Sequence, residues 1–541
     1  MSNDSLKKNV LVQGSILAAA SIVVRIIGLI YRIPLTRILG DTAMGYYSYA
    51  FEIYSLCLIL SSYSLPLAVS KLVSARVVRE EYNNSHRVFK FSLAFGAVVG
   101  LVATLFLYFV ADAYSALISS PNVAIPLRVL APTIFLFSVM GVIRGYFQGH
   151  NNMVPTAISQ VVEQILNAVV SIVAAYFMLE AFADKDNQLA YGAAGGTLGT
   201  LSGALAALIC LVVIYLVHRP LIKARITGET PNVKESYSHI FKVLLATALP
   251  VIISQTIYQI SGSLDSVIYN MVMTTKGVDE ELRSSLWGIY SNKYRVLTNV
   301  PVAIASAMGT AVVPSLISEY VVGNLDAVKH RIATVVKFNM IIAFPCAIGF
   351  IVLAKPILML LFGDGSSVSA GMLQLGGICV VFFALSTVTN GVLQGINRMS
   401  LPVIHSAISL VIHVPVLYIL LRFTDLNADA LVICNCLFPA VVCVLNWLSI
   451  KKHIDYKQET LNTFIMPAIC SLIMGMAVAF IYRLLDFAGN TVACIISIGL
   501  AIIIYFFLLI KLKALTKDEL LAMPKGRLLV RVFTRLKLLN K

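Results

Sequence analysis

Arginine, amide and carboxylate side chains lie inside the long apolar segments of this 541-residue sequence. The first such segment has a stripe made of Ser21, Arg25, Gly28 and Arg32. Its steps of four, three and four residues place the four side chains on one face of a helix. Because arginine binds two phosphate oxygens at once, the stripe predicts a site for a phosphate-bearing ligand. The alternative is that Arg32 extends to the membrane surface and Arg25 pairs with an acid.

A second cationic stripe lies near the middle of the chain. It consists of Asn292, Arg295 and Asn299 on one predicted helix face, with Lys293 beside it. Since the two stripes belong to opposite halves of the chain, we expect Arg25, Arg32 and Arg295 to converge on a cavity between two lobes. The structural alternative is an ion pair between the lobes.

Other polar residues at membrane depth form two groups and one isolated acid. The groups are Gln160, Glu163, Gln164 and Asn167 in the fifth apolar segment, and Gln255, Gln259, Gly262 and Asp265 in the seventh. Glu52 in the second segment is the isolated acid. Charges inside a bilayer are costly, so these residues are predicted to bind substrate. Alternatively, the acids pair with arginines or bind a coupling cation, and the fifth-segment stripe bonds a neighbouring helix. His405 and His413 share a helix face and either relay protons or pack.

The composition identifies the elements that must position these residues. Hydrophobic residues make up 59% of the chain, charged residues 12%, and the mean hydropathy is +0.87. A soluble chain is about 25% charged, so a soluble enzyme and a disordered protein are excluded. Long apolar runs also exclude a transmembrane β-barrel. The sequence predicts an all-α polytopic membrane protein with fourteen helices, at 12–36, 44–70, 88–111, 123–148, 154–180, 190–217, 240–272, 284–317, 333–354, 368–395, 400–422, 428–450, 461–483 and 489–511.

The distribution of positive charge predicts the topology. Most of the 41 Lys and Arg residues lie in alternate loops, which places both termini on the cytoplasmic side of the membrane. No cleaved signal peptide is expected. Beyond residue 513, apolar and basic residues take opposite faces of a predicted helix, which favours an interfacial helix over a disordered basic tail. Its apolar face is Leu528, Leu529, Val532, Phe533 and Leu536, and its basic face is Arg527, Arg531 and Arg535.

An internal repeat relates the two halves of the chain. Gln148, Gly149, Asn151 and Met153 match Gln394, Gly395, Asn397 and Met399, each 246 residues later. Pro66 and Ser70 match Pro314 and Ser318 at an offset of 248. Because six predicted helices separate the copies, the repeat is parallel, with two pseudo-symmetric six-helix lobes. The predicted domains are an N-lobe at 1–225, a C-lobe at 226–455, two additional helices at 456–512 and the basic tail at 513–541.

Several kinds of chemistry leave no trace in the sequence. There is no GxxxxGK[ST], HExxH or GxSxG motif, and the loops are too short for an enzyme domain. The nine cysteines are scattered without a CxxC, so we expect neither a metal site nor disulfides. We therefore expect a transporter with no catalytic residues and no cofactor, driven by the membrane potential, a coupling cation or the substrate itself.

Four segments carry a family resemblance: VVRIIGLIYRIPLTRILG (24–40), SLPLAVSKLVS (64–74), RGYFQGHNNMVPTAISQVVEQ (144–164) and AMGTAVVPSLISEY (307–320). They resemble the flippases of the multidrug/oligosaccharidyl-lipid/polysaccharide (MOP) exporter superfamily. Within it, the chain looks most like the stage V sporulation protein B group and the MurJ-type lipid II flippases of Gram-positive bacteria. The resemblance covers nearly the whole chain.

The resemblance implies roles for particular residues. Arg25 and Arg32 look like the helix-one arginines of MurJ-type proteins, and Arg295 looks like the helix-eight arginine, all implicated in binding a lipid pyrophosphate. The family can have a further basic residue in helix two, where this chain has Glu52. Residues 460–511 would form a groove for the polyprenyl tail.

Taken together, these features predict a flippase for an undecaprenyl-pyrophosphate-linked cell-wall precursor, lipid II above all, working by alternating access. The expected partners are that lipid-linked sugar, membrane lipids and cell-wall synthesis machinery, and no nucleic acid. The alternatives are a flippase for another lipid-linked polysaccharide unit, a cation-coupled multidrug antiporter of the same fold, and a non-transporting scaffold. An antiporter for cationic drugs needs an acid-lined pocket, whereas bases outnumber acids at membrane depth here.

Overall fold

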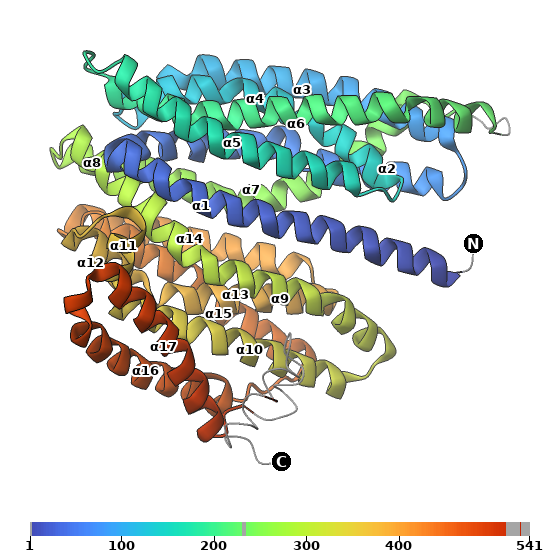
Figure 1. Cartoon of the computed structure of the whole chain (residues 1–541). Helices are drawn as coiled ribbons and strands as arrows, with labels where there is room; N and C mark the ends of the chain where they lie inside the picture. The colour runs from blue at the N-terminus through green and yellow to red at the C-terminus, as the bar shows by residue number, and fades with distance from the viewer. Residues whose placement is uncertain (1–2, 230–233, 516–530, 532–541) are drawn as a thin grey trace. The chain divides into compact units, whose positions relative to one another are not determined.

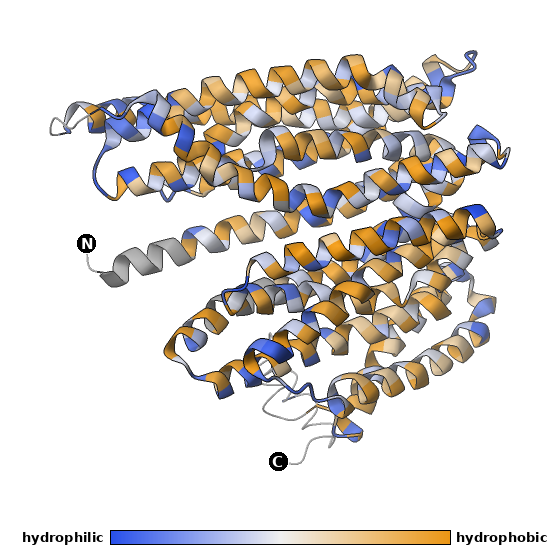
Figure 2. Ribbon diagram, turned by 180° about the vertical axis from the view of Figure 1, so that it is seen from behind, coloured by the Kyte–Doolittle hydropathy of each residue, from blue (hydrophilic) through white to orange (hydrophobic). Residues whose placement is uncertain are grey.

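The computed structural model describes the backbone of residues 3–229, 234–515 and 531. Side chains are described for the same residues except 3–11, 254, 258, 310–312, 314 and 315. Within this part of the chain the fold is helical and contains no strand (Figure 1). Apolar residues cover the middle of the helices, and the hydrophilic residues gather at helix ends and loops (Figure 2). The predicted all-α class is confirmed.

The chain forms two compact units, residues 1–292 and 293–541. Unit 1 contains α1 (Asn3–Leu58), η1 (Ile59–Tyr63), α2 (Leu65–Val77), α3 (Tyr82–Leu117), η2 (Pro121–Val123), α4 (Ala124–Gly149), α5 (Val154–Ala181), α6 (Gln188–Thr227), α7 (Tyr237–Thr275) and α8 (Glu280–Gly288). The π-helical turn η3 (Ile289–Tyr294) spans the boundary. Unit 2 continues with α9 (Arg295–Val322), α10 (Leu325–Val352), α11 (Ala354–Phe362), α12 (Ser367–Gly376), α13 (Cys379–Gly395), α14 (Ser400–Phe423), α15 (Asp429–Ile454), η4 (Leu461–Ile465), α16 (Met466–Leu484), η5 (Asp486–Ala488) and α17 (Asn490–Lys511).

Eleven helical stretches in the described residues are long and apolar enough to cross a membrane, or twelve if the bent pair α12–α13 is one span. One stretch, 12–77, has 66 residues, which at ~1.5 Å per residue is about three times the ~30 Å hydrocarbon core. It is interrupted at Gly40, whose φ of 72° and ψ of 175° are non-helical. Glycine adopts this conformation without a Cβ clash, so it separates the first two predicted spans. The multi-pass character is established, whereas the count of fourteen stays a prediction.

Small residues let α4 approach α2 closely in unit 1. Gly145 and Gly149 lie on one face of α4, and a Cβ on Gly145 would come within 2.7 Å of the Pro66 carbonyl oxygen. A Cβ on Gly149 would lie 2.6 Å from Val73. In lipid, where there is little hydrophobic drive between helices, such close packing supplies van der Waals contact.

Unit 2 repeats this packing at the matching positions. A Cβ on Gly391 of α13 would lie 3.4 Å from the Gly309 carbonyl oxygen of α9. A Cβ on Gly395 would lie 2.9 Å from the Leu316 side chain of α9. The turns that follow α4 and α13 also match, because Asn151 has φ 57° and Asn397 has φ 59°. Asparagine tolerates this left-handed conformation better than most residues. The internal repeat therefore has a structural counterpart within each unit.

The division into compact units falls at a different place from the predicted lobe boundary near residue 226. α7 packs against α1, α2 and α3, so packing groups it with unit 1. The predicted lobes are the parts that would move relative to each other during transport, whereas the two compact units are defined by packing. The lobe boundary therefore stays a prediction. Of the predicted basic tail at 513–541, the structure describes residues 513–515 and residue 531, and the rest lies outside the described residues.

Candidate functional site

The cationic stripe of α1 combines one exposed arginine with a close helix contact. Arg25 is exposed and Arg32 is half-buried. Gly28, between them, faces α5, where the Gln164 amide nitrogen would lie 3.2 Å from an added Cβ. The glycine thus brings α1 against α5 and brings two predicted site residues together. The neighbours of Arg25 along α1 include the exposed apolar residues Ile22 and Ile26.

Glu163 of α5 is engaged in an ion pair. Its Oε2 accepts from Arg144 Nη2 of α4 at 2.8 Å, and Arg144 Nε donates to Ser159 Oγ at 2.9 Å. Only 10% of the Arg144 side chain and 21% of the Glu163 side chain are exposed. This is the structural pairing that the sequence left open, and it removes Glu163 as a free carboxylate. Gln160, one turn away, has a buried amide oxygen that accepts no hydrogen bond from the described residues.

The remaining acids at membrane depth lie where α1 meets α7. Glu52 is buried, and its carboxylate would be 2.5 Å from a Cβ on Gly262. Ser263 Oγ donates to the Glu52 carbonyl oxygen at 3.3 Å. Asp265 is also buried, one turn further along α7, whereas Gln255 and Gln259 are half-buried. The structure thus brings Glu52 of α1 against Gly262 of α7, one helical turn from Asp265.

Asn292 holds η3 to α1. Its Nδ2 donates to Ser48 Oγ at 2.6 Å and to the Met44 carbonyl oxygen at 3.1 Å, and the residue is buried. Asn299 on α9 is exposed and Arg295 is half-buried, so the predicted stripe is not one uniform surface. The reason is the π-helical turn, which changes the residue spacing between Asn292 and Asn299.

Lys293 has a partner within unit 2. Its Nζ donates to Asp364 Oδ2 at 2.5 Å, and Asp364 also accepts from Ser369 Oγ and from the Ser366 backbone N–H. Burial alone would raise the pKa of Asp364, but these hydrogen bonds outweigh it and lower the pKa to about 2. The lysine therefore lies in a fixed ion pair at the loop between α11 and α12.

The two histidines of α14 pack against α15. His405 Nδ1 donates to Asn446 Oδ1 at 2.7 Å, and its Nε2 lies 3.1 Å from Ser449 Oγ. His413 Nδ1 donates to the Cys434 carbonyl oxygen at 3.1 Å. Both rings are buried and hydrogen-bonded, which supports the packing interpretation over a proton relay.

Within unit 1, the structure thus brings residues of the predicted site into contact in three places. Gly28 meets Gln164, Glu163 meets Arg144, and Glu52 meets Gly262. The convergence of Arg25 and Arg32 with Arg295 concerns both units and stays a prediction.

Sequence reasoning missed one polar contact set at the start of α7. There Arg76 binds the Glu235 carboxylate with two nitrogens, and Arg87 donates to the Glu235 carbonyl oxygen at 3.0 Å. The Glu235 backbone N–H donates to Asn84 Oδ1 at 3.1 Å. In the sequence, the only sign of this contact is that Arg76 and Glu235 have opposite charges. They are 159 residues apart, so no local pattern links them.

The comparisons with known proteins agree with this architecture. The model of the family described as "Polysaccharide biosynthesis protein" matches residues 10–321, and the MatE model matches residues 296–419. The first match covers more than half of the chain. The chain belongs to the polysaccharide biosynthesis protein family, in the MurJ and stage V sporulation protein B group of the MOP superfamily.

Two proteins of Bacillus subtilis (strain 168) are similar over most of their length. Lipid II flippase MurJ is 25% identical over 485 residues, which are 87% of this chain and 88% of that protein. Stage V sporulation protein B is 24% identical over 524 residues, 95% of this chain and 98% of that protein.

Solved structures show the same fold. A structure of lipid II flippase MurJ in an inward closed conformation matches with a TM-score of 0.65 and 16% identity, covering 91% of this chain and 97% of that one. An inward-facing multidrug resistance MATE family transporter matches with a TM-score of 0.67 and 17% identity, covering 80% and 94%. The family and these neighbours are transporters, so the chain is placed among transporters rather than enzymes.

Proposed function

We propose that this protein is a flippase that moves an undecaprenyl-pyrophosphate-linked cell-wall precursor, lipid II above all, from the inner to the outer leaflet. The family, the similarity to lipid II flippase MurJ over 87% of the chain and the shared fold support a lipid-linked substrate. The headgroup crosses within a polar cavity, and the lipid tail stays in the bilayer.

The observation that carries the proposal is the exposed side chain of Arg25, which lies on α1 between the exposed apolar residues Ile22 and Ile26. An arginine at membrane depth is costly unless it meets an anion or reaches water. Glu163, which precedes the Gln164 that Gly28 of α1 faces, already binds Arg144. Arg25 with Arg32 is therefore suited to a pyrophosphate, and Arg295 of α9 would complete the cationic site when both lobes face the substrate.

Rocking of the two lobes around this site would give alternating access. Because the substrate headgroup is negative, an inside-negative membrane potential assists its outward movement by ~2.3 kcal/mol per charge per 100 mV. The chain has no nucleotide-binding loop motif, which agrees with a drive from the potential or from a coupling cation.

The C-terminal helices would guide the lipid tail. α16 and α17 pack against each other and against α10 and α11 in unit 2. They expose large apolar side chains to the surroundings, among them Leu472, Met476, Phe480, Ile502 and Ile503. A polyprenyl chain fits such a surface because it offers only apolar contact.

A flippase for another lipid-linked glycan is the nearest alternative, because the polar residues of the candidate site are not specific for one sugar. A cation-coupled multidrug antiporter is favoured by one feature, the buried acids Glu52 and Asp265. Cationic drugs would be drawn to these carboxylates but repelled by Arg25 and Arg32.

The proposal is tested in a bacterium depleted of its own lipid II flippase. The wild-type chain should restore lipid II exposure at the outer face, measured by labelling of surface-accessible lipid II. Arg25→Ala should lose most of this activity at equal expression. Arg25→Lys should retain part of it, because the lysine ammonium keeps the positive charge but cannot bind two phosphate oxygens side by side as the guanidinium does.

Arg128→Ala is the matched control. Arg128 is a partly exposed arginine of α4 that pairs with Asp112 and is not part of the α1 stripe. It should flip lipid II as the wild type does. Absence of rescue by a well-expressed wild-type chain would contradict lipid II as the substrate, and full activity of both Arg25→Ala and Arg295→Ala would contradict the cationic site.

A further inference from the structure

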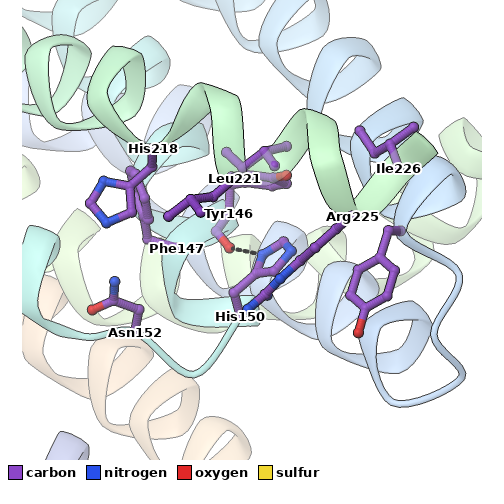
Figure 3. A pocket seen from close by; sticks show the side chains of 10 residues that line it. Tyr146, Phe147, His150, Asn152, His218, Leu221, Arg225 and Ile226 are labelled. Atoms are coloured by element: carbon purple, nitrogen blue, oxygen red, sulfur yellow. Dashed lines mark hydrogen bonds between the residues drawn. The ribbon is translucent and has the colours of Figure 1, made fainter. Parts of the chain in front are cut away.

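A pocket of about 190 Å³ opens in unit 1 where α4 and α6 end and α3 begins (Figure 3). None of the candidate transport residues lines it. The lining residues are Tyr82, Tyr146, Phe147, His150, Asn152, His218, Leu221, Ile222, Arg225 and Ile226. A single water needs only ~10–15 Å³ of such space, while drug-sized ligands occupy pockets of ~300 Å³ or more. The pocket therefore suits a small chemical group rather than a whole sugar or drug.

The polar part of the lining favours an anion. Arg225 lies over the Tyr82 ring at 5.8 Å, and its side chain runs beside the His150 ring (Figure 3). Asn152 Oδ1 accepts from the Val154 backbone N–H at 3.3 Å, which leaves the Asn152 amide nitrogen as a donor. The ten lining residues include one arginine and no carboxylate. The guanidinium of Arg225 therefore has no counter-charge within the lining, and the Asn152 amide offers a further hydrogen-bond donor. This combination suits a phosphate group.

The two histidines of the pocket are oriented by the backbone. His150 Nδ1 lies 2.9 Å from the Tyr146 carbonyl oxygen, and His218 Nδ1 lies 2.8 Å from the Ile214 carbonyl oxygen. A carbonyl only accepts, so Nδ1 carries the proton in both rings, and Nε2 becomes a second donor when the ring is protonated. The rings can thus add hydrogen bonds to a bound anion.

The rim of the pocket is apolar and basic. Leu221 is 65% exposed, and Ile222 and Ile226 line the pocket one turn apart on α6. Arg219 and Lys223 are exposed on the same stretch of α6. The sequence places this stretch at the inner membrane surface, where basic residues attract anionic lipids by ~1 kcal/mol each.

We propose that this pocket binds a phosphate group, anchored by Arg225 with Asn152 and His150 as further donors, and that the phosphate belongs to an anionic phospholipid of the inner leaflet. The acyl chains of that lipid would lie along Leu221 and Ile222. The same polar chemistry would accept a free phosphate, so the experiment separates the two sources.

Binding is expected to depend on pH through His150. Burial lowers the pKa of His150 most, its hydrogen bond to the Tyr146 carbonyl partly offsets this, and the positive charge of Arg225 lowers the pKa further. The other ionisable groups around it are Tyr146 of α4, whose ring centroid lies 4.5 Å from that of His150, together with His86 and Tyr82 of α3 and His218 of α6. A bound phosphate raises the pKa of His150, so binding takes up a proton and tightens as pH falls, by at most about tenfold per pH unit.

The test uses the full-length protein in nanodiscs of phosphatidylcholine with or without phosphatidylglycerol, and counts retained lipids by native mass spectrometry. The wild type should retain phosphatidylglycerol over phosphatidylcholine, and Arg225→Gln should weaken this retention about tenfold or more. Lys223→Gln is the matched control, since it removes an exposed charge of α6 that does not line the pocket. His150→Gln should remove most of the pH dependence, with His218 accounting for any remainder, and should keep the binding seen at pH 8.

The outcomes separate the two sources of phosphate. Equal retention of both lipids, with saturable binding of inorganic phosphate that Arg225→Gln abolishes, would overturn the lipid and assign the site to a free phosphate. Unchanged phosphatidylglycerol retention in Arg225→Gln, at a melting temperature equal to that of the wild type, would overturn the proposal. So would an equal loss in Lys223→Gln, because the effect would then be surface charge alone.

Discussion

Matching positions of the two units hold polar networks of different kinds. Arg144 of α4 and Asn390 of α13 are 246 residues apart, and each lies five residues before a matched helix-packing glycine. Arg144 forms an ion pair with Glu163 of α5 at 2.8 Å. Asn390 Oδ1 instead accepts from Asn446 of α15 at 2.8 Å, in a network of neutral groups.

The difference shows what the repeat constrains. The glycines, the helix contacts and the left-handed turn recur in both units, so the repeat fixes the backbone. The side chains within that frame diverge to a charged pair in one unit and an amide–imidazole network in the other. A buried ion pair is sensitive to the loss of one partner, because the remaining charge stays desolvated, whereas a neutral network loses only hydrogen bonds.

Arg144→Ala should give the largest effect. It leaves Glu163 partly buried without its partner, and we expect a loss of about 3 kcal/mol in the free energy of unfolding. Thermal unfolding of the purified protein in detergent measures this. The double variant Arg144→Ala with Glu163→Ala should regain part of the loss, and an additive result would show that the pair does not couple.

Asp364→Asn should be next in size and tests the partly buried carboxylate that pairs with Lys293 in unit 2. The pKa of Asp364 falls from 3.8 in the unfolded chain to about 2 in the folded protein. After allowance for solvent screening, this shift contributes at most about 2 kcal/mol to the free energy of unfolding. Since the folded pKa is depressed, this stability is present above about pH 4 and is lost as the pH falls towards 2. The difference between wild type and Asp364→Asn should therefore be constant from pH 5 to pH 8. A difference that changes across this range would contradict the assignment.

Asn446→Ala should cost less, about 1.5 kcal/mol. Its amide donates to Asn390 and to Thr389 Oγ1, both at 2.8 Å, and its oxygen accepts from His405. Removing it leaves these groups without their partner but leaves no charge behind. The same unfolding assay ranks it against Arg144→Ala. A cost above that of Arg144→Ala would reverse the comparison between the two networks.

Asn151→Ala and Asn397→Ala should give the smallest and most similar effects. Both residues have a positive φ. Asparagine tolerates this conformation, whereas alanine in the same conformation should lower the free energy of unfolding by about 1 kcal/mol. Asn151→Gly and Asn397→Gly should be neutral within a few tenths of a kcal/mol. Unequal losses in the two alanine variants would show that the two turns are not equivalent.

Several features could be read directly from the residue order. The apolar runs determine the helices and the membrane class, because a span of ~20 apolar residues has no other stable state in lipid. The matched glycine and asparagine positions revealed a repeat that the backbone shares, since only small or left-handed-tolerant residues fit there. The helical spacing of Arg25, Gly28 and Arg32 likewise placed them on one face of the first helix, whereas the contact of Gly28 with α5 came from the structure.

Other features depend on contacts between distant segments, which no local spacing encodes. Glu163 could have lined a cavity, but α4 brings Arg144 to it. The stripe through Asn292 and Asn299 was interrupted because a π-helical turn changes the helical register between them. The pocket around Arg225 forms only where α3, α4 and α6 meet. The sequence by itself determined the helices, the membrane class and the repeated frame, because these follow from periodicity and composition. Only the tertiary structure decided which charges are paired, because pairing depends on which helices become neighbours.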